Sequence, residues 1–449
     1  MEQEEVVCRR LDAQLLRGSR VQSPDDVVRH LLAVQAQEFP YARWSLAQRT
    51  LRESGATIAA TAVAAATAAA ATASATTTAA DVEQAVSDGR ILRTHILRPT
   101  WHFVHRDDLR WLRALSAPRL HRANAGTYRR TGIDAAAAER SGRVLADAVR
   151  GGRHLTREQL AEQLQRAGFA ASGLGLAYLI MHAEISGVLA SGSPVRSPGG
   201  ALKQTYALFD ERVPAGPVEP LPREEALDEL ARRYFTSRGP ATVKDCADWS
   251  GVTMTDVRHG LARVLDSAPA VLETVAIDGV EHYFQAGTDG AAAASGGRLA
   301  SGAAAASGGR LASGGAAASG GAAASGRSAA SGATERDGGS AGAVPRIDLI
   351  QCYDEYVMGY SATRHYFGGS APAFPLGGAP MHVVLLDGRM AGSWRHTLFP
   401  GRCELEIRLA GPSDPGALEG KAVEGAVHSA VERYGAFLGI PAVWVGSRT

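Results

Sequence analysis

The stretch that decides the fold is Thr242-Val-Lys-Asp-Cys-Ala-Asp-Trp-Ser-Gly-Val-Thr-Met-Thr255, with helical periodicity continuing to Leu265. Its first part, up to Trp249, is a predicted helix, and a second predicted helix begins at Thr255. Gly251 lies between them, where a glycine allows the chain to turn sharply. This pattern is typical of a helix-turn-helix.

Two predicted strands follow this pair of helices. Val271 to Ile277 and His282 to Gln285 flank Asp278-Gly279, a dipeptide that favours a two-residue hairpin turn. A further helix is predicted over Glu224 to Phe235, before the helix-turn-helix. Helices followed by a hairpin, in this order, predict a winged helix.

Similar units are predicted earlier in the chain. In one of them Thr156 is the N-cap of a helix, Leu174 to Val188 forms another helix, and Gln204 to Phe209 is a strand. The first unit contains Gln35 and Gln37 and ends in a basic strand from Arg93 to Val104. Helix-turn-helix units are common in DNA-binding proteins, although the same geometry also serves protein contacts.

The pattern changes to strands near the C-terminus. A hairpin is predicted around Asp387-Gly388, and a long helix over Leu418 to Leu438. The predicted strands are Met381 to Leu386, Met390 to Trp394, Glu404 to Leu409 and Ala442 to Val445.

We therefore predict an α+β fold in which tandem winged-helix (helix-turn-helix) domains are followed by a small β-rich C-terminal domain. The predicted units are 1–150, with a low-complexity insertion at 55–80, then 151–215, 220–286, a disordered Gly/Ala/Ser linker at 287–343, and the β-rich domain at 344–449. The linker has almost no large apolar residue and cannot offset the entropy of ordering.

Composition excludes several classes of protein. The four cysteines among the 449 residues have no zinc-finger spacing, so we expect neither a metal site nor a disulfide scaffold. The acidic N-terminus has no secretory signal, and the alanine-threonine stretch from Thr57 to Ala80 is too weakly apolar for a membrane span. We expect a cytoplasmic, nucleoid-associated protein without membrane contact.

The overall net charge is only +1, but the local charge is strongly positive. Ten arginines lie between Arg90 and Arg130, against the two acids Asp107 and Asp108. Aromatic side chains alternate with these arginines, which is typical of a nucleic-acid surface and less so of a solvated helix face.

The glutamine motif, Gln35-Ala36-Gln37, follows a helix that Ser23 caps and Pro24 begins. Residues two apart diverge on a helix but share one side of an extended segment, so both glutamines can face one site only if the helix has ended. The alternative is that both amides merely satisfy backbone groups at the helix end.

A second cluster is Tyr353-Asp354-Glu355-Tyr356, together with Trp394-Arg395-His396 downstream. Acids, aromatics and an arginine could clamp a sugar-phosphate backbone or a flipped base. They could equally cover an interface between domains, where Tyr, Trp and Arg are common anchors.

Taken in order, these motifs resemble the AlkZ-like family of winged-helix DNA glycosylases. The resemblance rests on Gln35-Ala-Gln37, Arg93-Thr-His-Ile-Leu-Arg-Pro-Thr-Trp-His-Phe103, Arg238-Gly-Pro-Ala-Thr-Val-Lys-Asp245, Tyr353-Asp-Glu-Tyr356 and Gly392-Ser-Trp-Arg395. It covers nearly the whole chain outside the two low-complexity insertions, which look longer than the family needs. A related branch has aspartate at the last motif position, so Gln37 places this chain nearer the AlkZ branch.

The resemblance implies excision of N7-alkylated purines from DNA, with unhooking of interstrand crosslinks in some members. Such a purine is already cationic, so its departure needs little general acid, and neutral amides can place the water. The resemblance implies catalytic roles for both glutamines. Gln37 would position the water, and Gln35 would help to orient it. None of the three lysines lies in the glutamine motif or the basic motif, so we expect a monofunctional hydrolase that needs no cofactor.

The expected partner is double-stranded DNA containing alkylated bases, bound by a monomer. The candidate DNA contacts are Arg93, His95, Arg98, Trp101, His102, Tyr353, Asp354, Glu355 and Arg395. Trp101 could instead be a core residue. The main alternatives are a non-catalytic winged-helix regulator whose β-rich domain senses a ligand, and a nucleic-acid scaffold with a tethering linker.

Overall fold

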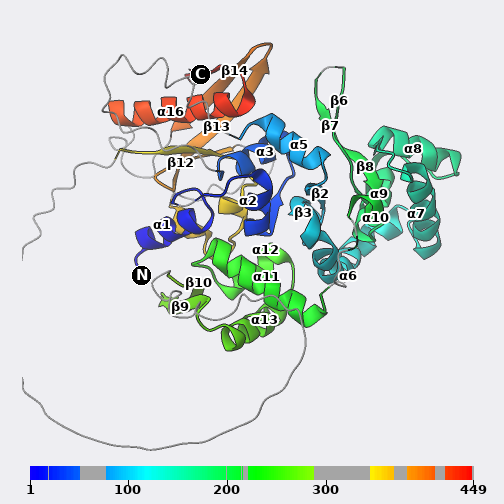
Figure 1. Cartoon of the computed structure of the whole chain (residues 1–449), viewed down its shortest axis with the longest axis horizontal. Coiled ribbons are helices and arrows are strands. Elements are labelled where there is room, and N and C mark those ends of the chain that lie inside the picture. Colours follow the sequence, from blue (N-terminus) through cyan, green and yellow to red (C-terminus); the bar gives the residue numbers. More distant parts are fainter. Residues whose placement is uncertain are drawn as a thin grey trace, which may run out of the picture.

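A computed structural model describes residues 1–18, 20–50, 77–198, 200–213, 215, 221–287, 344–368, 382–409 and 420–446. These residues form a mixed helix and sheet structure, which confirms the predicted α+β class. The first unit lies between the third unit and the C-terminal sheet, and the second unit projects to one side (Figure 1).

The first unit is built around a three-stranded sheet of order β1-β3-β2. Ser23 caps α2 as predicted, by accepting a hydrogen bond from the Asp26 amide. Pro40 lies in the first turn of the next helix, where proline is tolerated. The elements are α2 (Pro24–Leu31), β1 (Ala33–Gln35), α3 (Phe39–Ala47), α5 (Ala79–Ser87), β2 (Ile91–His95) and β3 (Trp101–His105).

The basic segment predicted as one strand from Arg93 to Val104 is a hairpin, so that prediction was wrong. Leu97 has a φ of 61°, and the amide of Arg98 bonds to the Ile96 carbonyl at 2.6 Å, which turns the chain back on itself. Pro99 lies in the same turn and has no amide to offer a strand. Composition alone did not reveal this reversal.

A long helix, α6 (Arg106–Arg130), runs from the first unit into the second. The second unit has a sheet of order β4-β8-β5, and a small ribbon, β6 with β7, extends from it (Figure 1). Helix α7 (Ala135–Val149), from the range predicted for the first unit, shares the core of the second. The other elements of the second unit are β4 (Leu155–Thr156), α8 (Arg157–Arg166), α9 (Gly173–Ile185), β5 (Leu189–Ser191), β6 (Val195–Arg196), β7 (Leu202–Lys203), β8 (Thr205–Leu208) and α10 (Phe209–Arg212).

In the third unit three helices precede a two-stranded hairpin. Gly251 ends the second helix with a φ of 75°, and Asp278 and Gly279 have positive φ in the hairpin turn, as their sequence predicted. The elements are α11 (Arg223–Arg238), α12 (Val243–Ser250), α13 (Met254–Ser267), β9 (Leu272–Ile277) and β10 (Val280–Gln285).

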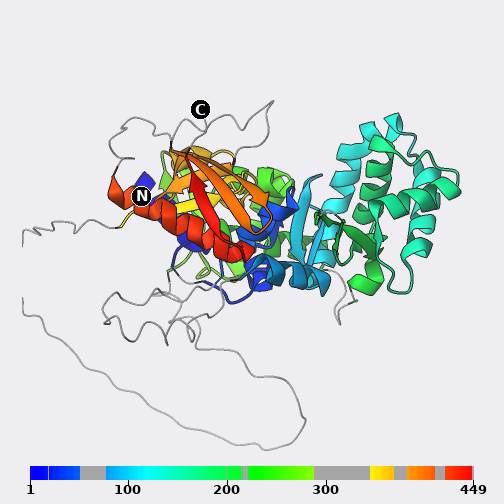
Figure 2. The same cartoon turned by 90° about the horizontal axis from the view of Figure 1, so that it is seen from above.

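The C-terminal part is a five-stranded sheet of order β11-β12-β13-β14-β15, with α16 lying across one face (Figure 2). The last strand pairs in parallel with β14. The elements are β11 (Ile347–Ile350), α15 (Glu355–Met358), the 3-10 helix η1 (Arg364–Phe367), β12 (His382–Leu386), β13 (Arg389–Phe399), β14 (Arg402–Leu409), α16 (Lys421–Leu438) and β15 (Ala442–Val445).

The N-terminal helix α1 (Gln3–Ala13) joins the third unit to the segment before β12. Arg10 is fully buried, and its guanidinium bonds the Pro240 carbonyl and the Thr363 hydroxyl. The predicted linker from residue 288 onward lies outside the described residues, as do residues 55–76 of the predicted insertion. Because α5 begins at Ala79, that insertion ends before residue 80. Among the described helices, none has both the length and the apolarity to cross a membrane.

A second fully buried arginine fixes the start of the C-terminal part. Arg49, just past α3, forms a two-point ion pair with Asp354, with N–O distances of 2.6 and 2.9 Å. Both side chains are 0% exposed. Removing one member of a buried pair leaves the other charge uncompensated, which is costly.

We therefore expect Asp354→Asn to lower the free energy of unfolding by about 3–5 kcal/mol. Urea denaturation followed by circular dichroism would measure this loss. Glu139→Gln is the matched control, because Glu139 pairs with Arg143 on the exposed face of α7 and should hardly move the midpoint. Equal midpoints for the two variants would contradict the structural role of Asp354.

Candidate active site

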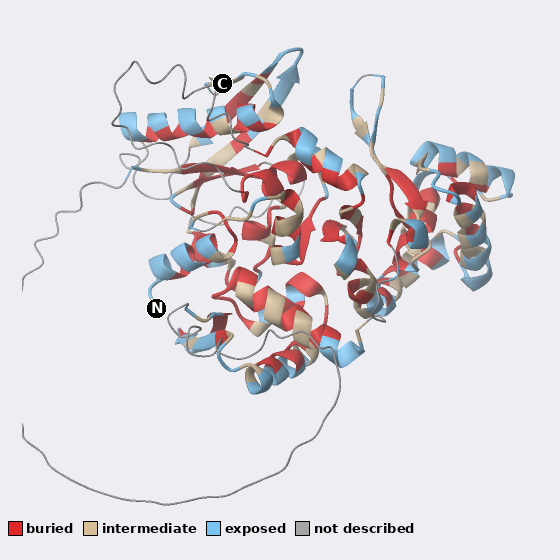
Figure 3. Cartoon of the chain, viewed as in Figure 1, coloured by how far each residue is buried: buried red, intermediate tan, exposed pale blue. Residues whose placement is uncertain are grey.

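The glutamine motif is extended, as facing one site requires. Helix α2 ends at Leu31, Leu32 has a φ of 66°, and β1 then carries Gln35 at its end. Gln35 is 3% exposed, whereas Gln37 is exposed. The strands of this sheet lie in the buried centre of the molecule (Figure 3). The motif thus runs from the core to the surface.

The Gln35 side chain and backbone have separate partners. Its Oε1 accepts a hydrogen bond from Arg98 at 2.8 Å. The backbone amide of Gln35 donates to Glu355 Oε1 at 2.8 Å, and its backbone carbonyl accepts from Gln351 Nε2 at 3.3 Å. Gln35 is therefore held from three sides, and its side chain does not bond to helix-end backbone groups as the alternative supposed.

Gln37 is held more loosely. Its Oε1 accepts a hydrogen bond from the backbone amide of Trp101 at 3.3 Å, so this glutamine does satisfy a backbone group, on β3 rather than on a helix. The nearby Ala36 amide bonds to the Trp101 carbonyl at 2.7 Å and extends the sheet by one residue. The side chain of Gln37 therefore lies at the sheet edge, and the residue is exposed.

Arg93 clamps the motif from the side. Its Nε donates to the Ala36 carbonyl at 2.9 Å and another nitrogen to the Gln37 carbonyl at 3.2 Å. The guanidinium lies 4.3 Å from the centre of the Trp101 ring and also bonds to Gln204. Burial lowers the pKa of Arg93 to about 10, so it stays charged at neutral pH. These contacts hold the motif, and the DNA contact predicted for Arg93 stays a prediction.

His95 and His102 lie below the surface, and the DNA contacts predicted for them stay predictions. His95 is almost fully buried and bonds Glu184 at 2.8 Å, with its ring against Trp101. His102 is 0% exposed. Trp101 is half-buried and packs against the core of the second unit, which agrees with the core alternative for this residue.

The cluster at residues 353–356 supports the interface alternative. Glu355 is 0% exposed and accepts hydrogen bonds from Arg238 at 2.7 Å and from Trp249 Nε1 at 2.8 Å. Asp354 is equally buried against Arg49. Neither carboxylate can reach DNA, because each is enclosed with its arginine. Tyr353 stays half-exposed.

Arg395 lies apart from this cluster. It is exposed on β13 and pairs with Glu406, with an Nε–O distance of 2.6 Å. The motif quoted for residues 238–245 contained Arg238, but its role was not predicted, and no local pattern distinguished Arg49 or Trp249 as partners of these carboxylates.

Unsatisfied polar atoms gather around Gln35. Among the described residues, eight buried side-chain nitrogen or oxygen atoms have no hydrogen-bond partner. Four of the eight are Arg98 Nε, Thr100 Oγ1, His102 Nε2 and Gln351 Oε1. Arg98 and Gln351 bond Gln35 directly, and His102 is its partner across the strands. Buried polar groups without protein partners commonly bind ordered water.

One group beside the motif has the composition of a metal site. The ligand atoms of Glu38, Cys352 and His382 lie within 4.8 Å of one another. However, His382 Nδ1 accepts a hydrogen bond from the Cys352 amide at 3.2 Å, so its Nε2 carries the proton. That nitrogen faces Glu38 at 3.8 Å and offers no lone pair to a metal. Burial raises the pKa of Glu38 and lowers the pKa of His382 to about 4.

A groove runs along α6 to the turn between β2 and β3. Two adjoining cavities of about 490 and 760 Å³ share Arg119, Ala123, Val252 and Thr253, so they follow α6 past the turn between α12 and α13. The smaller cavity ends at Arg98, which holds Gln35. Arg119 and Arg122 are exposed in this groove, and neither forms an ion pair within the described residues.

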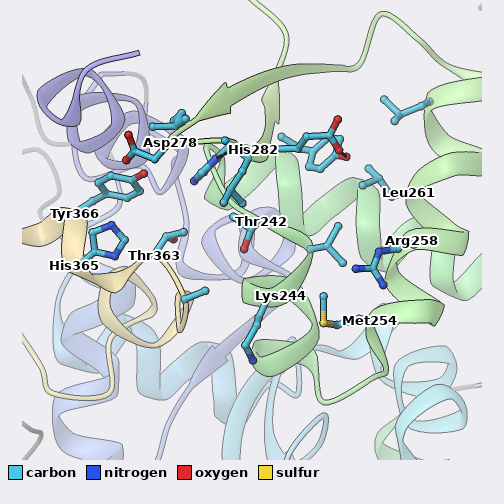
Figure 4. A pocket seen from close by; sticks show the side chains of 18 of the residues that line it. Thr242, Lys244, Met254, Arg258, Leu261, Asp278, His282, Thr363, His365 and Tyr366 are labelled. Carbon is cyan, nitrogen blue, oxygen red and sulfur yellow. Dashed lines mark hydrogen bonds between the residues drawn. The ribbon is translucent and has the colours of Figure 1, made fainter.

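A separate cavity of about 640 Å³ lies between α13, the β9–β10 hairpin and the turn at 362–366 (Figure 4). His282 and Tyr366 line it on one side, and Lys244 and Arg258 on the other. No residue of the glutamine motif or of the β2–β3 hairpin lines it. The candidate active site is therefore the motif with its groove.

Comparison with known proteins identifies the family of this chain. The model of the family described as DNA glycosylase AlkZ-like matches residues 28–437. Among solved structures, the Streptomyces sahachiroi DNA glycosylase AlkZ is similar, with a TM-score of 0.61 and 18% identity. That match covers 99% of this chain and 100% of the other, and at this identity it concerns the fold. A search of curated proteins found no match. Because the family model spans most of the chain, including the glutamine motif, this protein belongs to the AlkZ-like family of DNA glycosylases.

Proposed function

We propose that this glycosylase hydrolyses the N-glycosidic bond of N7-alkylated purines through a water held at the glutamine motif. The observation that carries the proposal is the extended pair, Gln35 and Gln37, beside four buried polar atoms that lack protein partners. Such a site offers hydrogen bonds for a water, and the carboxylate that bonds Gln35, Glu355, is already paired with Arg238 and Trp249.

The charges near Gln35 explain the choice of substrate. The only carboxylate that bonds Gln35 among the described residues is Glu355, and its oxygens are occupied by Arg238, Trp249 and the Gln35 amide. A paired, fully buried carboxylate is unsuited to protonating a departing base. The base must therefore leave without that help, as a purine made cationic by N7 alkylation does.

The lysines support a monofunctional hydrolase. Lys203 pairs with Glu158, Lys244 pairs with Asp248, and Lys421 begins α16. None of them hydrogen-bonds to the glutamine motif within the described residues, whereas a lyase needs an amine at the sugar. Trapping of a lysine adduct by borohydride would overturn this part of the proposal.

Crosslinks are included in the proposed substrates because Gln37 is exposed. A bulky lesion could approach the motif without entering a closed pocket. An exposed motif is compatible with general repair of alkylation damage and also with self-protection against an alkylating natural product.

We further propose that the three helical units are tandem winged helices that bind double-stranded DNA as a monomer. The phosphate backbone would lie in the groove beside α6, where Arg119 and Arg122 are exposed and unpaired within the described residues. A regulator with the same fold would instead dimerise on one operator.

Gln37→Ala should lower the release of 7-methylguanine from methylated duplex DNA about 100-fold or more, because the attacking water loses its orienting amide. Single-turnover assays at saturating protein measure this rate. Affinity for the DNA should stay within twofold. Gln165→Ala, at an exposed position of α8, is the matched control and should keep the wild-type rate. Loss of affinity in place of rate would assign Gln37 to binding.

Arg119→Ala and Arg122→Ala should each weaken DNA binding and reduce the slope of log K against log salt by about 1, because each removes one phosphate contact. Fluorescence anisotropy over a salt series measures both effects. Arg143→Ala is the control, since Arg143 already pairs with Glu139. An unchanged slope for both groove variants would show that the DNA phosphates bind elsewhere on the protein.

Arg98→Ala should behave differently from the groove variants. Its guanidinium is largely buried and bonds Gln35, and burial lowers its pKa. We therefore expect a lower rate of base release with a salt slope close to that of the wild type. A reduced slope at an unchanged rate would instead make Arg98 a phosphate contact.

A further inference from the structure

The imidazole of His102 has one ring nitrogen that nothing in the described structure uses. Its Nδ1 lies 3.0 Å from the Thr100 carbonyl. A carbonyl can only accept, so Nδ1 carries the proton and Nε2 has a free lone pair. Nε2 is buried without a hydrogen-bond partner, and the residue is 0% exposed.

This lone pair lies on the same side of the sheet as Gln35. His102 is on the central strand β3, and Gln35 on β1 is its direct partner in the register. Side chains of directly opposed residues share a face, with Cβ atoms about 4.5–5.5 Å apart. His102 and Gln35 are therefore neighbours, although no hydrogen bond joins them.

The two side chains offer complementary groups. Gln35 Oε1 is occupied by Arg98, so the Nε2 of Gln35 is the free end of the amide, and it donates to no acceptor among the described residues. His102 offers an acceptor without a donor. A donor and an acceptor on neighbouring side chains that do not bond each other can share one bridging water.

The surroundings keep His102 neutral. Burial is the main cause that holds the pKa of His102 well below its usual range, and the charge of Arg98 acts in the same direction. The other groups acting on the ring are His95 and Arg238, which also lower its pKa, and the Thr100 carbonyl, which raises it. At neutral pH the ring therefore offers a lone pair rather than a second proton.

We propose that His102 is a catalytic residue, whose Nε2 accepts a hydrogen bond from the attacking water and then takes its surplus proton. This inference rests on the proposed hydrolysis of N7-alkylated purines. Gln35 Nε2 would donate to the same water, which leaves a lone pair of the water for the sugar.

The chemical step balances with these groups alone. The bond between C1′ and N9 breaks, and its electron pair stays with the purine and cancels the positive charge. The water oxygen forms the new bond to C1′ and loses one proton to His102 Nε2. The imidazolium then releases that proton to solvent. A weak base suffices, because water bonded to an oxocarbenium carbon is a strong acid.

Two substitutions separate the role of His102 Nε2 as a hydrogen-bond acceptor from the structural role of the ring. His102→Asn can still donate to the Thr100 carbonyl but has no atom at the position of Nε2. His102→Gln can extend an amide oxygen towards that position. We expect single-turnover release of 7-methylguanine to fall at least 100-fold in the first variant and at most tenfold in the second. Thr94→Val is the control, since Thr94 is the other cross-strand partner of His102, and should stay within threefold of the wild type.

A second measurement reports on the water itself. In methanol–water mixtures the wild type should give almost only the hydrolysed sugar, because its water is held in place. The residual activity of His102→Asn should give methyl glycoside in proportion to the methanol. Release by His102→Asn within threefold of the wild type, or equal product ratios for both proteins, would overturn the role of His102 while leaving the proposed function intact. No release by the wild type would overturn both.

The pH dependence follows from the state of the ring. Because the acceptor must be unprotonated, the single-turnover rate should be flat through neutral pH and fall only in acid, as pH drops through the lowered pKa of His102. His102→Gln should lose this acid limb. A profile with the same acid limb in both proteins would contradict the assignment.

Discussion

The buried pair of Glu355 and Arg238 is the interaction on which the candidate active site depends. The two residues are 117 positions apart, and both are 0% exposed. Arg238 also donates to the carbonyls of Leu31 and Ala33, where α2 gives way to β1. Glu355 meanwhile accepts from the amide of Gln35, 320 positions away. One charged pair thus joins the third unit, the C-terminal part and the glutamine strand, and fixes the backbone that presents the motif. Burial of two charges is tolerated here because every oxygen of the carboxylate has a donor.

Arginine has two distinct roles in this chain. Arg10, Arg49 and Arg238 are fully buried and join segments that are distant in sequence. Arg119 and Arg122 are exposed along the groove. The planar guanidinium suits both roles, because it bonds several carbonyls or carboxylates at once inside the protein and phosphates outside it. A net charge of +1 conceals this division.

Local signals in the sequence predicted local structure well. The caps at Ser23 and Thr156 and the turns at Asp278 and Asp387 were identified correctly, since each depends on a few adjacent residues. The β2–β3 hairpin was missed because its turn rests on a positive φ at Leu97, a residue type that gives no such signal.

The carboxylates of Asp354 and Glu355 were misassigned for another reason. Their partners Arg49 and Arg238 lie 305 and 117 residues away, so only the fold brings them together. The acidic and aromatic composition of this segment is compatible with an interface and with a DNA clamp alike, and burial decides between them. The end of the helix before the glutamines was predicted correctly, because its cap and periodicity define it, whereas the question whether both glutamines face one site was left open.

The compensation of charge around Gln35 bears on catalysis as well as on folding. During loss of an N7-alkylated purine, positive charge moves from the base to the sugar, and its total does not change. A free carboxylate against the base would stabilise the substrate more than the transition state and would slow its departure. Glu355 is prevented from acting in this way because Arg238 and Trp249 occupy it. In the proposed mechanism the groups that reach the sugar are neutral dipoles, the amides of Gln35 and Gln37, which can order a water without favouring the charged base. A neutral His102 behind them continues the same principle, since an imidazolium at that position would repel the cationic sugar. The buried ion pair thus holds the strand in place and compensates the charge of Glu355, while the guanidinium of Arg98 bonds the oxygen end of the Gln35 amide.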